Sequence, residues 1–445
     1  LGPKLCRRFY EPIVLLAGLN KAVPHSTPVA TATRIEVTQG PEQSFHCFIN
    51  KLSQVCDNIR GGPTVTSFTV LQEPDKVVYV FASNRRKQDE LDVTKEFIIS
   101  ILQQLGEASI ETEGKTREAF TTLLYPILAF NRLRIEFYVD KLSKELEKCK
   151  QVCHRGTSQD DPSLLDSLQQ LGDIASYHTR SDLSDGEFVR SSETLLTAIN
   201  HLYESWLGNV IRDRAKEGRM DMVECWVGLR HYAGRLLSLY FAAQDLLYAR
   251  RAWPELFLDF EVKTIPSSEA AANPMKKKSA SANELIGRIM SDPDEIERYR
   301  ELARELQKCN LDELIRQQCT RTTFKPIAHA EVLVLNWLKT NGYTRPDRFF
   351  EGWKYIGASK PTCRLCSYYF HANSDGIQCR PSHGNLYPNW RVCDVYRDQG
   401  DRATVDREKV LNGILERIRD DACRTLREKT SDGKRYDSNT YSARL

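Results

Sequence analysis

The sequence predicts an α/β domain combined with a large all-α region, and three observations support this fold class. Helical periodicity followed by two β-branched, aromatic-rich runs occupies residues 45–84. Nearly every segment from about 88 to 260 has the apolar spacing of a helix. After residue 329, helices and short strands alternate, which is typical of α/β architecture. Because 445 residues exceed what one hydrophobic core normally accommodates, we expect two or three domains.

The composition narrows the class of protein. With 41% hydrophobic and 28% charged residues, the chain is ordinary for a soluble globular protein. No run approaches the roughly 18 apolar residues of a membrane helix, so we expect no membrane association. The 13 cysteines are odd in number and scattered, which favours a reducing, intracellular location, cytoplasmic or nuclear. The net charge of +3 does not by itself indicate a nucleic-acid partner.

The N-terminal half divides into three parts. Residues 1–42 lack strong periodicity and are expected to form an N-terminal extension. In residues 43–85, apolar spacing predicts a helix that "RGGP" should end, and "TVTSFTVLQEPDKVVYVFASN" predicts a β-hairpin around "QEPDK". Residues 86–262 predict a helical bundle, since long amphipathic segments alternate with short polar breaks. The surface of this bundle is a candidate binding site for a protein partner.

The C-terminal half begins with a predicted linker at 263–283, where small, polar and basic residues show no periodicity. Residues 284–430 are expected to form the α/β domain, and the polar segment 431–445 a disordered tail. The elements expected after a helix-rich stretch are a helix at 329–339, a strand within 352–359, a helix from about Thr362, a strand near 376–380 and a long helix at about 404–428.

Three potential metal ligands occur in this domain in a specific order. Cys363 and Cys366 form a C-x-x-C pair at the start of a predicted helix, where unpaired N–H groups and the helix dipole favour thiolates. Together with His329 they supply two sulfurs and one nitrogen, which suits zinc and leaves a fourth position open for water. Glu331 is then available to move protons. Since residues i and i+2 lie about 200° apart on a helix, His329 and Glu331 converge only in an irregular first turn.

The order of His-x-Glu, proline and C-x-x-C is typical of zinc-dependent deaminases. In that chemistry the metal lowers the pKa of a bound water, and a carboxylate that does not bind the metal transfers protons. Addition of water to an amino-bearing ring carbon and loss of ammonia then convert the amine to a carbonyl.

Two alternatives remain open on the residues alone. Cys363, Cys366, Cys379 and Cys393 could form a closed structural zinc knuckle. Alternatively, His329 could be an inert buried residue beside two cysteines that bind no metal. In the first case the chain would be a non-catalytic interaction or scaffold protein, with the helical bundle as its working surface.

The segment from His329 to about Trp390 resembles the cytidine-deaminase-like superfamily. Within it, "HAEVLVLNWL", "YIGASKPTCRLCSYYF" and "HGNLYPNW" are similar to the Orientia-toxin-like deaminases, a group common in fungal genomes. The resemblance implies an α-β-α three-layer domain and one catalytic Zn²⁺ bound by His329, Cys363 and Cys366, with Glu331 as the proton shuttle.

One residue departs from the pattern of that family. Many members place proline directly before the first cysteine, whereas here Thr362 separates Pro361 from it. This insertion could alter the backbone group that meets the substrate base.

The resemblance also implies that the domain is split. The superfamily places a helix and a β-hairpin before the His-x-Glu helix, and no hairpin fits between 284 and 328. We therefore expect 45–84 to complete the sheet, with about 85–325 as an insertion. Related deaminases often carry an asparagine at the end of the second strand that contacts the substrate sugar, and Asn84 has this place; an asparagine that closes a strand into a turn is the alternative.

Further substrate contacts are expected at Ser359, Tyr387 and Trp390. Aromatic residues near a deaminase site can stack on a base, although buried aromatic residues more often belong to the core. The substrate implied is a nucleobase of cytosine or adenine type, in a nucleic acid or a nucleotide. The motifs do not distinguish these possibilities.

Overall fold

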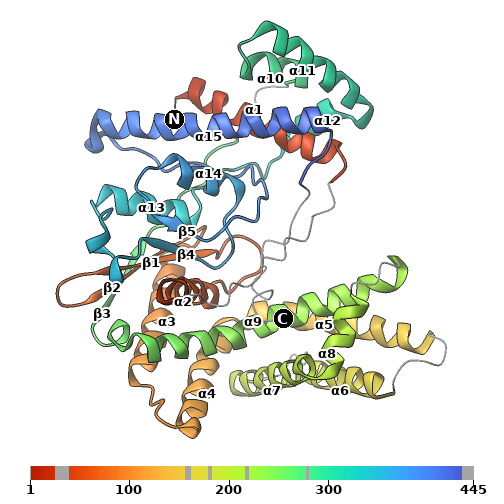
Figure 1. Cartoon of the computed structure of the whole chain (residues 1–445), viewed down its shortest axis with the longest axis vertical. Helices are drawn as coiled ribbons and strands as arrows, with labels where there is room; N and C mark the ends of the chain where they lie inside the picture. The colour runs from red at the N-terminus through yellow and green to blue at the C-terminus, as the bar shows by residue number, and fades with distance from the viewer. Residues whose placement is uncertain are drawn as a thin grey trace.

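The computed structural model describes residues 2–25, 40–155, 162–178, 183–215, 220–276 and 280–432. Within these residues, a mixed sheet of five strands lies among 15 α-helices, and the predicted α/β class with a large helical content is confirmed (Figure 1). The strands are β1 (Thr66–Gln72), β2 (Val77–Ser83), β3 (Phe260–Ile265), β4 (Tyr355–Ala358) and β5 (Gln378–Cys379).

The sheet joins distant parts of the chain. Its strand order is β3-β2-β1-β4-β5. The hairpin strands β1 and β2 are antiparallel, and β1 also pairs antiparallel with β4, with Ser67 opposite Ala358 and Phe68 opposite Gly357. The outer pairs, β2 with β3 and β4 with β5, are parallel. The hairpin therefore lies in the same sheet as the strands that surround the candidate metal ligands.

The sequence of the hairpin explains its central place. Successive side chains of a strand point to opposite faces, so an unbroken apolar run suits a strand that is covered on both sides. In β2, Tyr79 and Phe81 pack into the core beside α2 (Pro41–Cys56), whereas Val78 and Val80 pack into the core on the other face. All four side chains are buried.

Helices cover both faces of this sheet. On one side, α13 (Ala330–Thr340) contacts β1, β2 and β4, and α14 (Arg364–Ala372) lies beside it. On the other side, α2 contacts β1 and β4, and α3 (Gln88–Glu107) contacts β3. Figure 1 shows this arrangement of helix, sheet and helix.

Two further groups of helices extend the layers. Above α14 lie α1 (Pro3–Ala22) and α15 (Gly400–Glu428), together with α10 (Ala282–Ile289), α11 (Pro293–Glu305) and α12 (Leu311–Thr320) (Figure 1). Below α2 lie α4 (Glu113–Phe130), α5 (Arg132–Arg155), α6 (Pro162–His178), α7 (Asp185–Glu204), α8 (Trp206–Arg214) and α9 (Met220–Ala252). Among the described helices, none is both long and apolar enough to span a membrane.

Several expected boundaries differ in the structure. The N-terminal extension contains α1, whose buried face packs against α12 and α15. The helix α2 ends at Cys56, before "RGGP", because Asp57 leaves helical geometry. The first two residues of the expected tail belong to the described structure, where the Ser431 N–H donates to the Pro24 carbonyl oxygen at 3.1 Å. Residues 433–445 lie outside the described part.

The expected linker at 263–283 is also partly structured. Its first three residues belong to β3, a strand that the pattern of the sequence did not reveal. Farther on, Asn273 Nδ2 donates to Cys319 O at 2.7 Å, and Met275 is buried. Residues 277–279, with two of the lysines, lie outside the described residues.

The packing of α2 on β4 depends on Gly357. A Cβ atom there would lie 2.4 Å from Ile49 Cγ2 and 3.0 Å from the Ile49 carbonyl carbon. We predict that Gly357→Ala lowers the free energy of unfolding by about 1–3 kcal/mol, because the overpacked contact must shift backbone. Urea unfolding monitored by circular dichroism measures this change. The control is Gly114→Ala in α4, where no atom lies within 4 Å; an equal loss in both variants would contradict the explanation.

Candidate metal centre

His329 lies at the N-terminal boundary of α13. It is the N-cap residue, with φ −73° and ψ 158°, and the helix begins at Ala330. Its carbonyl accepts the Leu333 N–H at 2.9 Å, so its backbone starts the helix while its side chain leaves the helical surface. Glu331 follows in the first turn. This is the irregular geometry that lets the two side chains face the same cavity.

The cysteine pair lies at a second helix start. Cys363 is the N-cap of α14, and its sulfur accepts the backbone N–H of Cys366 at 3.5 Å. Thr362, the residue inserted after Pro361, donates its hydroxyl to Arg380 O at 3.0 Å and its N–H to Pro381 O at 3.3 Å. The insertion therefore ties the cysteine turn to the segment after β5.

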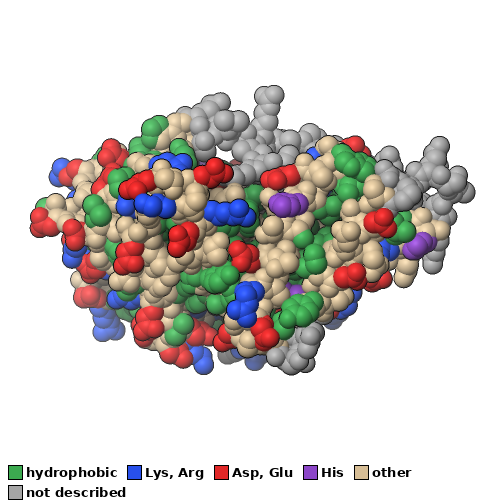
Figure 2. Space-filling view, turned by 90° about the horizontal axis from the view of Figure 1, so that it is seen from below, with side chains coloured by type: hydrophobic (Ala, Val, Ile, Leu, Met, Phe, Trp, Pro, Cys, Tyr) green, Lys and Arg blue, Asp and Glu red, His purple; other side chains and the backbone are tan. Residues whose placement is uncertain are grey.

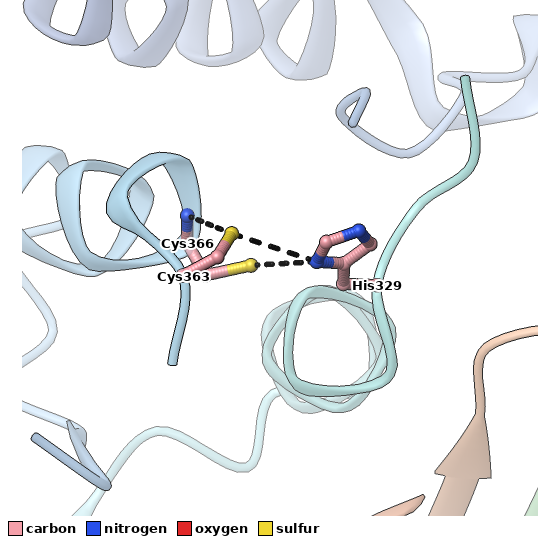
Figure 3. A group of neighbouring side chains, drawn as sticks. All are labelled: His329, Cys363 and Cys366. Atoms are coloured by element: carbon pink, nitrogen blue, oxygen red, sulfur yellow. Dashed lines mark hydrogen bonds between the residues drawn. The ribbon is translucent and has the colours of Figure 1, made fainter. Parts of the chain in front are cut away.

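The three predicted ligands point toward one another, as Figure 3 shows. His329 Nδ1 lies 3.6 Å from Cys363 Sγ and 3.4 Å from Cys366 Sγ, and all three donor atoms lie within 4.8 Å of one another. With Zn–N near 2.05 Å and Zn–S near 2.3 Å, a tetrahedral ion would place such atoms about 3.6 Å apart. The cluster could hold a metal ion, and its spacing fits zinc.

The charges at the centre support a metal-binding set. Burial opposes ionisation of Cys363, but hydrogen bonding from Cys366 and the charge of His329 hold the pKa of Cys363 well below its ordinary value. Burial and the neighbouring Cys363 raise the pKa of Cys366 well above its usual range. For His329, burial lowers the pKa, yet the charges of Cys363 and Glu331 outweigh burial and raise it overall, while Arg85 acts in the opposite direction.

Glu331 is not one of the three clustered donors. Its side chain is only 4% exposed, and it lines the same cavity as His329 and Cys363. Its Oε2 atom is buried and has no hydrogen-bond partner among the described residues. A buried carboxylate oxygen without a donor is costly, so this atom suits a ligand or water in the cavity.

Trp390 supports the metal centre instead of lining the cavity, which corrects its predicted role as a substrate contact. The residue is fully buried, and its Nε1–H donates to Cys366 Sγ at 3.1 Å. Its ring packs between Phe9, at a centroid distance of 5.9 Å, and Tyr369, at 6.0 Å. It therefore holds the sulfur of Cys366, one of the three clustered donors.

Ser359 is also not a lining residue. Its N–H donates to Thr66 O at 2.9 Å, and its hydroxyl accepts the Thr66 N–H at 3.3 Å. These bonds extend the pairing of β1 with β4. The predicted substrate contact at Ser359 is replaced by a role in the sheet.

Asn84 and Tyr387 both line the cavity. The Asn84 carbonyl oxygen accepts the Ala330 N–H at 2.8 Å, and its amide donates to Gly62 O at 2.9 Å. It therefore caps α13 from the hairpin and connects β2 to the residue beside His329. Tyr387 lies against the ring of His383, with centroids 5.6 Å apart, and His383 also lines the cavity.

The cavity has a volume of about 1070 Å³ and two walls. The metal side carries His329, Glu331 and Cys363. The opposite wall comes from α5 and α9 of the helical region and was not predicted, since no local motif marks it. Its lining side chains include Arg134, Phe137, Tyr138, Val227, His231, Tyr232 and Arg235.

The four-cysteine knuckle does not form. Among the described residues, the metal-compatible cluster contains His329, Cys363 and Cys366. The sulfur of Cys393 instead lies 3.9 Å from the Val332 carbonyl oxygen. A set of three protein ligands beside a cavity leaves room for a further ligand, as catalytic sites do.

The contact from Trp390 gives a testable prediction. Hydrogen bonds to metal ligands are worth about 10–100-fold in metal affinity. We expect Trp390→Phe to weaken zinc binding about tenfold, because the Cys366 sulfur loses its donor. Competition with a chromogenic chelator measures the affinity, with Trp206→Phe on exposed α8 as the control. Equal affinities in the two variants would show that the indole contributes packing alone.

Comparison with known proteins agrees with this geometry. Residues 328–394 match the sequence model of a family described as OTT_1508_deam-like deaminase. The match spans α13, β4, both cysteines and Trp390, but neither the hairpin nor the helical region. No curated protein and no solved structure matched the chain. Residues 328–394 of this chain are therefore similar in sequence to this deaminase-like family.

Proposed function

We propose that the protein is a zinc-dependent aminohydrolase that converts an amino-bearing nucleobase, of cytosine or adenine type, to its carbonyl form. One observation carries this proposal: three donors converge, and two of them, His329 and Cys363, line the cavity together with the separate buried carboxylate of Glu331. A purely structural metal site has no use for a neighbouring buried carboxylate, one of whose oxygens lacks a donor among the described residues. The deaminase match over the same residues supports the assignment.

The proposed metal is Zn²⁺, held by His329, Cys363 and Cys366. The mixed nitrogen and thiolate set favours zinc over magnesium or calcium, which prefer oxygen ligands. When bound, zinc supplies the Lewis acidity that makes water nucleophilic near neutral pH.

Glu331 is the proposed proton carrier. Its carboxylate accepts a proton from the attacking water and delivers it to the ring nitrogen next to the reacting carbon. The remaining proton of the added water then passes to the exocyclic amine, the C–N bond breaks, and ammonia is released. Overall, water adds and ammonia leaves, so no redox partner is needed. Because Glu331 is buried, its proton transfers occur away from bulk solvent.

The substrate base is expected between the metal side and the side chains of His383 and Tyr387. These two rings line the cavity, where an aromatic face can stack on a base. Asn84 also lines it, but both ends of its amide already hold the protein backbone. We therefore assign Asn84 to positioning of α13.

The decisive experiment compares the wild type with Glu331→Gln. We expect one zinc ion per chain in both proteins, and a loss of ammonia release of about 10²–10⁴-fold in the variant, since it loses its proton carrier. Metal content and ammonia release are measured over cytosine and adenine as free bases, nucleosides, nucleotides, and single-stranded DNA and RNA.

Glu408→Gln, an exposed position on α15, is the matched control and should behave as the wild type. Undiminished ammonia release by Glu331→Gln would refute its role. Folded wild type without zinc would refute the metal site. Zinc in every protein, with no ammonia from any substrate, would favour a scaffold with a structural metal.

A further inference from the structure

The candidate site has a second wall that belongs to the helical region. The metal side is formed by α13, the cysteine turn and the loop after β5, and α5 and α9 lie across the cavity from it. Figure 1 shows these two helices below the sheet, joined to it through α2. A cavity of about 1070 Å³ is large for a free base and slightly exceeds the roughly 300–1,000 Å³ of typical ligand pockets.

Two exposed arginines lie at this cavity on the hairpin side. Arg60 lies in the loop after α2, and its guanidinium lies over the Phe137 ring at 4.1 Å. Arg85 directly follows Asn84, whose side chain holds Ala330. Neither arginine forms an ion pair with a described residue, so both charges face solvent and the cavity.

Deeper in the wall, two more arginines surround one phenol. Arg235 donates to the Tyr138 hydroxyl through Nε at 3.2 Å and Nη2 at 2.9 Å. Arg134 lies 3.7 Å from the Asp57 carboxylate and is only 4% exposed. Although burial raises the pKa of Tyr138, the two guanidiniums outweigh it and hold that pKa below its ordinary value. The wall therefore contains two buried guanidinium groups, and that of Arg134 pairs with Asp57.

The charge of the cavity as a whole is positive. Lining it are six basic side chains, Arg60, Arg85, Arg134, Lys148, Arg235 and Lys360, and four acidic ones, Asp57, Glu145, Glu224 and Glu331. On the outer face in Figure 2, by contrast, Lys and Arg are interspersed with Asp and Glu. A nucleobase is neutral and needs no such cations, whereas a phosphate does.

We propose that the site takes a phosphorylated nucleoside and that Arg85 and Arg60 bind its phosphate. This inference rests on the proposed deaminase function, and it excludes free bases and nucleosides as the preferred substrates. Guanidinium groups bind phosphate oxygens through paired, charge-assisted hydrogen bonds. The phosphate can belong to a free nucleotide or to a single strand of nucleic acid, and in both cases the chemistry of recognition is the same.

The first test compares each nucleoside with its own 5′-monophosphate. We expect the wild type to favour the monophosphate at least tenfold in kcat/KM. Arg85→Ala or Arg60→Ala should lower the monophosphate value about tenfold through KM, and leave the nucleoside value nearly unchanged. Arg345→Ala, a control 77% exposed and outside the cavity, should change neither. Equal losses for nucleoside and monophosphate, or no preference for phosphate, would overturn the inference.

A binding experiment separates this inference from the function. Cytidine and adenosine monophosphates are titrated into zinc-loaded Glu331→Gln by calorimetry, with and without Arg85→Ala. Phosphate-dependent binding that Arg85→Ala weakens supports the inference even if no substrate yields ammonia, in which case the proposed function alone fails. If the wild type releases ammonia from nucleosides and shows no preference for their monophosphates, the proposed deaminase function stands and the inference about phosphate is overturned.

Single-stranded DNA and RNA oligonucleotides complete the comparison. If the oligonucleotides bind more tightly than the monophosphate, and their affinity falls steeply with salt, a nucleic acid is the source of the phosphate. Weaker binding than the monophosphate identifies a free nucleotide. No binding of any phosphate-bearing probe would overturn the inference.

Discussion

The hydrogen bonds between β1 and β4 hold the candidate site together. They place Ser67 opposite Ala358, two residues almost 300 positions apart in the chain. Once that pairing forms, Asn84 at the end of the hairpin reaches the first N–H of α13, and Ser359 reaches back to Thr66. Gly357 allows the pairing because α2 crosses β4 at contact distance. The metal ligands, the hairpin and the helical region are thereby fixed relative to one another.

The two cores meet at the sheet. One face of the hairpin packs into the helical region and the other into the layer that contains α13, α14 and the ligand cysteines. Because β2 is buried on both faces, the helical side helps to position this strand, and Asn84 and Arg85 directly follow it. This explains physically how a region outside the family match can shape the cavity.

The centre combines buried, reactive groups with few internal partners. Two buried cysteines converge on a half-buried histidine, and one of the sulfurs receives an indole N–H. Beside them lies a carboxylate oxygen that has no donor among the described residues. Such groups are costly to bury in an apolar interior unless an ion or ligand completes their coordination. The cost is consistent with a site built for binding and chemistry, not for stability.

The sequence by itself determined the features that depend on neighbouring residues. His-x-Glu and C-x-x-C each lie at a helix start, where the local backbone sets the side-chain directions, so His329, Cys363 and Cys366 could be named as one set and Glu331 set apart. The hairpin was predictable because its turn and both strands are contiguous. The tertiary structure decided what requires distant partners: the inward direction of Trp390, the use of Ser359 in the sheet, the edge strand β3 and the cavity wall of α5 and α9. Those roles depend on long-range pairing and packing, which no local periodicity records.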